Sequence, residues 1–230
     1  MPYYTLGGYL SYLIYMLPAY LIVLFIQIRL KSVVSKYSSV TVSSGLTGAE
    51  SAKLVASRGG AFGISVVPIS GQLTDNFNPE TNTISLSVPV YDKRSVTAVG
   101  IAAHEAGHAA QYAEEYGPAK LRSATVKICN IGSRLSLPLI FIGIIASIDA
   151  LIYAGIICFS AVVFFQLVTL PVEFNASSRA VKILSESGSL TEEELKGVRK
   201  VLNAAAMTYV GALATSVFQI LYYLSRARRK

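Results

Sequence analysis

Four long apolar runs dominate the chain and limit it to folds that place helices in a lipid bilayer. They cover residues 9–28, 135–148, 150–172 and 207–224. A helix needs about 20 apolar residues to cross the hydrocarbon core of a membrane, and the first run is about that long. Only 14% of the residues are charged, whereas a soluble domain carries roughly 25%, so composition also favours a membrane protein.

Basic residues indicate how the first run is oriented. No Lys or Arg precedes Arg29, and no small-residue cleavage site follows the run, so residues 1–29 are expected to form a retained membrane anchor. Arg29, Lys31 and Lys36 place the C-terminal end of this anchor in the cytoplasm. The net charge of +7 gathers at the ends of apolar runs, which fits lipid headgroups and gives no reason to expect nucleic-acid binding.

Residues 30–130 are expected to form a soluble α+β region. Thr47 precedes a helical stretch at 48–58, and residues 62–67 and 84–88 have strand character. A second helix is expected at about 95–116, ended by Gly117 and Pro118. Turn-forming residues separate the two strands: Gly71, Asp75, Asn76, Asn78 and Pro79.

The second half of the chain is predicted to cross or line the membrane. Residues 131–172 are expected to form a transmembrane hairpin with Asp149 at its tip, because a carboxylate in mid-bilayer is costly. Its first arm is short for a full span. A polar helix at 173–206 contains a start signal at 189–194, and residues 207–230 form a last apolar helix with a basic tail. If all four runs cross, that tail lies outside, against the positive-inside tendency; the alternative is a last helix lying in the interface.

The motif that carries chemistry is His-Glu-Ala-Gly-His at residues 104–108. On a helix, His104 and His108 share one face, so both imidazoles can bind one metal ion, with Glu105 placed to act as general base. Zinc suits two imidazoles and a carboxylate in a tetrahedral site whose fourth position holds water. The chain has only two histidines, and such spacing with the adjacent glutamate arises by chance about once in a thousand.

A third metal ligand must be Asp, Glu or Cys, because no other histidine exists. Glu173 is the best candidate, since it directly follows an apolar run that would return it to the side of His104; the alternative is a solvated charge at a helix end. Glu114 lacks the preceding glycine that a metzincin-type site needs. The remaining acidic and thiol candidates, which fit less well, are Asp149, Cys129 and Cys158.

Several stretches together resemble the bacterial neutral zinc metallopeptidases of the YugP-like group, membrane relatives of the gluzincin peptidases. The stretches are GQLTDNFNP at 71–79, ISLS at 84–87, residues 91–92 with 99–111, and PVEFNAS at 171–177. The resemblance covers nearly the whole chain. It implies a mostly helical α+β fold with a gluzincin-like zinc-peptidase core and several transmembrane helices.

The resemblance also implies roles for individual residues. His104, His108 and Glu173 would hold one zinc ion per chain, and Glu105 would be the general base and acid. The strand near 84–87 would edge the cleft and accept substrate as an added strand. This chain departs from the family pattern at Asn76 and Asn78, where histidine and aspartate are usual, and at Ser177, where related gluzincins carry aspartate.

The function expected from these features is zinc-dependent hydrolysis of peptide bonds by an endopeptidase of the bacterial plasma membrane, with its site on the cytoplasmic side. Ser177 is a candidate for supporting a ligand, and Asn175 and Arg179 are candidates for stabilising an oxyanion. Substrates would be proteins or peptides, including membrane proteins. Two alternatives are an intramembrane-cleaving metalloprotease and a non-catalytic zinc-binding scaffold or chaperone. A transporter is disfavoured because the apolar runs carry almost no polar residues.

Overall fold

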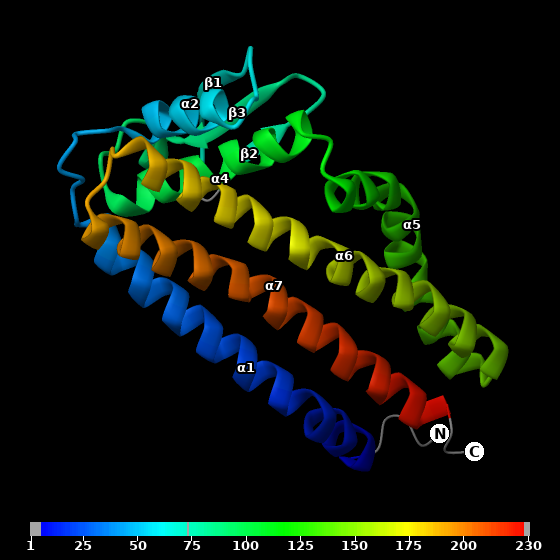
Figure 1. The fold of residues 1–230 in the computed structure, drawn as a ribbon. Coiled ribbons are helices and arrows are strands. Elements are labelled where there is room, and N and C mark those ends of the chain that lie inside the picture. The colour runs from blue at the N-terminus through cyan, green and yellow to red at the C-terminus, as the bar shows by residue number, and fades with distance from the viewer. Residues whose placement is uncertain (1–5, 73, 228–230) are drawn as a thin grey trace. The chain divides into compact units, whose positions relative to one another are not determined.

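The computed structural model describes residues 6–72 and 74–227, and most of them are helical (Figure 1). The expected class, a mostly helical α+β protein with several membrane-length helices, is confirmed. Three expectations concern residues outside the described ranges: the start of the anchor at 1–5, Leu73 in the GQLTDNFNP stretch, and the tail at 228–230. The elements are α1 (Leu6–Ser38), α2 (Gly48–Arg58), β1 (Ser65–Ile69), β2 (Asn76–Asn78), β3 (Thr83–Ser87), α3 (Val88–Tyr91), α4 (Val96–Ala113), α5 (Gly117–Ala146), α6 (Asp149–Ser187) and α7 (Glu192–Ala227).

The chain divides into two compact units. The helical unit comprises Leu121–Leu170 with the described parts of residues 1–27 and 208–230. The mixed unit comprises Ile28–Lys120 and Pro171–Met207, and it contains the three strands. The His-Glu-Ala-Gly-His motif at residues 104–108 and the candidate ligand Glu173 therefore both belong to the mixed unit.

Long apolar helices make up the helical unit. Within the described ranges, four helices are long and apolar enough to cross a membrane: Leu10–Ser38, Gly117–Ala146, Asp149–Ser187 and Glu192–Ala227. Large apolar side chains on these helices face outward, among them Ile14 at 71% and Ile157 at 72% exposure. A surface of this kind is unfavourable in water but matches lipid tails, which supports a membrane protein.

In the helical unit, α5 and α6 pack closely around small residues. A side chain at Gly143 would overlap Ile152, and one at Gly155 would overlap Ile140, so the two backbones approach as antiparallel neighbours. Ser147 takes a left-handed conformation with φ 58°, and Asp149 begins α6 at the junction where the sequence places a hairpin tip. The first arm is longer than expected, because α5 extends over 30 residues from Gly117.

A three-stranded sheet in the order β1-β3-β2 organises the mixed unit. β1 runs parallel to β3 and β2 runs antiparallel to it, and the β3 side chains Ile84 and Leu86 are fully buried. β3 is the central strand, and β2 already pairs with its residues 83–85, so substrate cannot add there as a further strand. Residues 76–78 were expected as a turn but form β2, because they pair with β3 and because the Phe77 ring packs against Tyr112 at 6.2 Å.

Helix α2 supports α4, the helix that carries the histidines. It begins where the sequence predicts: the Thr47 hydroxyl accepts from the Glu50 backbone N–H, and the Glu50 carboxylate accepts from the Thr47 N–H, which is a capping box. Ser51 then donates a hydrogen bond to the Val99 carbonyl of α4 at 3.0 Å. This hydrogen bond holds α2 against α4.

The ends of the later helices differ from the sequence expectations. α4 stops at Ala113, earlier than expected, because Glu115 takes a positive φ of 55°. Gly117 then begins α5 rather than ending the previous helix. The start signal expected at 189–194 is confirmed, because α7 begins at Glu192. Residues 173–206 therefore belong to two helices, since α6 ends at Ser187 and Gly188 takes a φ of 67° between them.

Candidate metal centre

Helix α4 presents His104 and His108 toward one side, and Glu105 follows His104 directly in the same helix. A row of small buried residues, including Ala102, Ala103, Ala106, Ala109 and Ala110, forms its opposite face against the core. The two histidines are four residues apart, and their ring centroids lie 4.7 Å from each other. The apolar pattern of the helix therefore fixes which way the two imidazoles point.

Gly107 is a point of close approach between α4 and α6. A Cβ at this position would overlap the carbonyl oxygen and carbonyl carbon of Ala176. Because Gly107 lies between Glu105 and His108, this contact draws α6 against the half-turn that carries the motif. Glu173, three residues before Ala176, is thereby brought over the histidines.

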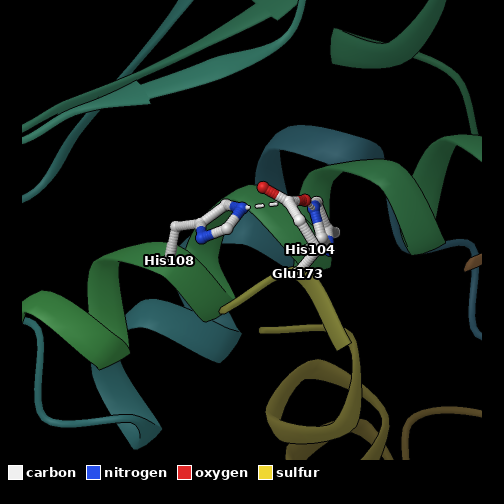
Figure 2. Close-up of side chains that lie close together, drawn as sticks. All are labelled: His104, His108 and Glu173. Carbon is white, nitrogen blue, oxygen red and sulfur yellow. Dashed lines mark ion pairs between the residues drawn. The ribbon is translucent and has the colours of Figure 1, made fainter. Parts of the chain in front are cut away.

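The carboxylate of Glu173 lies between the two imidazoles, as Figure 2 shows. Its Oε2 atom is 3.3 Å from His104 Nε2 and 3.6 Å from His108 Nε2, and the side chain is 2% exposed. One potential ligand atom from each of the three residues lies within 4.8 Å of the others. The sequence candidates His104, His108 and Glu173 are thus brought together.

These three donors fit a tetrahedral zinc ion. Zinc binds imidazole nitrogen and carboxylate oxygen at about 2.0–2.2 Å, which places neighbouring tetrahedral ligands about 3.3 Å apart. The two nitrogen-to-oxygen distances of 3.3 and 3.6 Å are close to that spacing. The set also has the two imidazoles and one carboxylate that catalytic zinc sites use while leaving one position open.

The second ring nitrogen of each histidine has its own partner. His104 Nδ1 lies 3.1 Å from the Ser177 hydroxyl, and His108 Nδ1 lies 3.0 Å from Gln111 Oε1. Metal-bound histidines almost always hold their second nitrogen in this way, which orients the ring. Ser177, which the sequence suggested as a support for a ligand, lies next to His104. Gln111, which lies next to His108, was not predicted to support a ligand. Its position one helical turn after His108 was the available signal.

Asn175 and Arg179 contact each other rather than the histidines. Asn175 Oδ1 accepts hydrogen bonds from Gln111 Nε2 at 2.9 Å and from Arg179 Nε at 2.7 Å. Arg179 also forms an ion pair with Glu114 at 2.6 Å and lies over the Tyr116 ring. Neither residue shows a contact that favours the expected oxyanion role. Glu114 faces Arg179 instead of the histidines.

The other ligand candidates lie elsewhere. Asp149, Cys129 and Cys158 belong to the helical unit, and both cysteines are free thiols. The described residues of the mixed unit therefore supply the whole candidate centre. Glu173 is the carboxylate that joins the histidines.

Electrostatics within the centre favour the protonated forms of Glu105 and His108. Burial raises the pKa of the Glu105 carboxyl; the neighbouring imidazoles oppose this effect, and the charges of Glu173 and Asp75 add to it. Burial disfavours the charged form of His108, but the carboxylates of Glu173 and Glu105 outweigh it and raise the pKa of this imidazole. The site thus holds a cation or a proton among its carboxylates readily.

Comparison with known proteins gives two matches. A family model described as "Putative neutral zinc metallopeptidase" matches residues 12–228. The protein titled "Putative membrane protease YugP" from Bacillus subtilis (strain 168) is 46% identical over 200 residues, which cover 86% of this chain and 88% of that protein. No solved structure matches.

Proposed function

The chain belongs to this family of neutral zinc metallopeptidases, and on that premise we propose that it is a membrane-bound, zinc-dependent endopeptidase. Its reaction would be hydrolysis of peptide bonds in protein substrates. The observation that carries the proposal is the convergence of His104, His108 and Glu173 beside Glu105. A scaffold that only bound zinc would need the three ligands but would have no use for the glutamate between the histidines.

The residues present would divide the work of hydrolysis. His104 Nε2, His108 Nε2 and the Glu173 carboxylate would hold zinc. Zinc is a Lewis acid, and it would lower the pKa of water so that water could lose a proton and act as a nucleophile near neutral pH. The Glu105 carboxylate would take the proton from the attacking water and later give it to the leaving amine.

A hollow beside the centre is a candidate site for a substrate side chain. It measures about 270 Å³ and opens between α6 and α7, and its lining includes Ser177, whose hydroxyl contacts His104. Val181, Leu202 and Ala206 give it apolar walls, and Arg199 also lines it. We propose that an apolar side chain next to the scissile bond enters here, because binding energy near the reacting group positions the peptide.

We further propose that the enzyme acts at the cytoplasmic face of a bacterial plasma membrane. Arg29, Lys31 and Lys36 follow the apolar run of α1, which favours a cytoplasmic location for the segment after it. Glu173 directly follows the apolar run at 150–172. Both features favour substrates that are membrane proteins or segments emerging from the bilayer.

The test compares wild-type protein with Glu105→Gln, both purified in detergent and loaded with zinc. We expect the wild type to cleave protein and peptide substrates, with the activity abolished by a chelator. Glu105→Gln should keep one zinc ion per chain but lose cleavage, because an amide cannot accept the proton from water. Full activity in Glu105→Gln would overturn the assignment of the base, and a wild type that never binds zinc would overturn the proposed function.

A further inference from the structure

Gln111 is buried, with 1% of its surface exposed. Both the oxygen and the NH₂ group of its amide form hydrogen bonds within the candidate centre. It lies on α4, three residues after His108, and reaches across to α6. Its Nε2 group donates to the Val172 carbonyl at 2.8 Å and to Asn175 Oδ1 at 2.9 Å. Its Oε1 atom faces His108 Nδ1 at 3.0 Å.

The contact with Val172 fixes which way the amide points. A backbone carbonyl oxygen can only accept a hydrogen bond, so the NH₂ end of Gln111 must face Val172. Asn175 reinforces this orientation, because its Oδ1 atom already accepts from the guanidinium of Arg179 and acts as an acceptor toward Gln111 as well. The amide oxygen of Gln111 must therefore face the imidazole.

The orientation of Gln111 in turn fixes the tautomer of His108. An amide oxygen only accepts, so His108 Nδ1 must carry the proton and donate it. The lone pair of the neutral ring is then on Nε2, the atom that lies 3.6 Å from the Glu173 carboxylate. His104 has no equivalent constraint, because the Ser177 hydroxyl can donate as well as accept.

Gln111 also sets the position of the third ligand. Val172, whose carbonyl accepts from Gln111, is the residue directly before Glu173 in α6. One buried side chain therefore holds both the ring of one ligand and the backbone next to another. We propose that Gln111 is the positioning residue of the metal centre. It orients the His108 ring so that Nε2 faces zinc, and it holds the backbone before Glu173 so that the Glu173 carboxylate reaches the same ion.

This inference rests on the proposed zinc site, so its test measures zinc binding apart from hydrolysis. Gln111→Met keeps the length of the side chain but removes every hydrogen bond. We expect its zinc affinity, measured by chelator competition on the full chain in detergent, to fall roughly 10- to 100-fold. The matched control is Gln27→Met, which makes the same change at an exposed position of α1, outside the mixed unit, and should retain zinc affinity.

Nuclear magnetic resonance of the imidazole nitrogens supplies a second readout, and it is simple because the chain has two histidines. In zinc-loaded wild type, we expect His108 to bind metal through Nε2 and to show a slowly exchanging Nδ1 proton. That proton should exchange much faster in Gln111→Met, whereas the His104 signals should change little. A loss of packing alone would not single out one ring in this way.

The outcomes separate the two proposals. Zinc bound by wild type through His108 Nδ1 would overturn the role of Gln111, even if Gln111→Met failed to fold. Equal zinc affinity and equal proton exchange in a folded Gln111→Met would also overturn it while leaving the zinc site intact. A wild type without zinc would overturn the proposed function itself.

Discussion

Gly107 of α4 lies so close to the carbonyl of Ala176 in α6 that no side chain fits between them. The contact joins the helix that carries both histidines to the helix that carries Glu173. The glycine inside the motif thus has a packing reason, since it allows the third carboxylate to reach the imidazoles.

Gly107→Ala should therefore damage the metal centre without touching a ligand. The added methyl group meets backbone atoms that cannot rotate away, so α6 must shift, at a cost of about 1–3 kcal/mol. We expect weaker zinc binding and a lower melting temperature. Gly117→Ala is the matched control, because its new methyl group meets nothing within 4 Å. A Gly107→Ala protein with wild-type zinc affinity would show that this contact does not position Glu173.

Glu173→Gln should remove most zinc binding while keeping the shape of the side chain. An amide oxygen is a weaker zinc ligand than a carboxylate, and the negative charge between His104 and His108 is lost. The fall in zinc affinity should exceed the roughly 10- to 100-fold loss expected for a supporting hydrogen bond. Zinc content is measured by mass spectrometry after dialysis. Unchanged content in Glu173→Gln would mean that another group is the third ligand.

Local sequence signals identified the parts of the site that one helix forms by itself. The spacing of His104 and His108 required only a helix, and Thr47 marked the start of α2 because the preference for such a residue at a helix N-terminus is local. Glu173 could be proposed as a ligand from its place after an apolar run. Its distance to the histidines depended on the packing of α6 against Gly107, which no local pattern encodes.

The features that were missed depend on contacts between distant segments. Asn76 and Asn78 favour turns locally, but pairing with β3 makes them a strand. The same pairing places β3 in the centre of the sheet and occupies residues 83–85, where substrate was expected to add as a strand. Gln111 looked like an ordinary polar residue at the end of α4, because its partner Val172 lies 61 residues away.

The capping box of α2 predicts a dependence of stability on acid. Hydrogen bonds from the Thr47 backbone and hydroxyl lower the pKa of Glu50 below its usual value near 4.5. A carboxylate with a lowered pKa stabilises the fold above the pKa of the unfolded chain, and this contribution is lost as the pH falls through the folded pKa.

Glu50→Gln should therefore melt below the wild type at pH 7, and the difference should shrink as the pH falls below about 4. Melting temperatures across this range in detergent measure the effect. Glu80→Gln is the control: it changes a carboxylate whose side chain makes no hydrogen bond or ion pair among the described residues. A difference between Glu50→Gln and wild type that stays constant from pH 7 to pH 3 would contradict the assignment.

Ser178→Tyr tests whether the hollow between α6 and α7 receives substrate. Ser178 is exposed and lines the hollow, so a tyrosine there would fill space without disturbing the core. Loss of a side-chain pocket should lower kcat/KM for a good peptide substrate about tenfold or more, mainly through KM. Zinc content should not change, because Ser178 contacts none of the three ligands.

Ser185→Tyr, an exposed position on the same helix outside the hollow, should leave both kcat/KM and zinc content at wild-type values. If Ser178→Tyr has wild-type KM for every peptide tested, substrate side chains bind elsewhere, whereas zinc loss in this variant would mean that the hollow supports the metal centre instead.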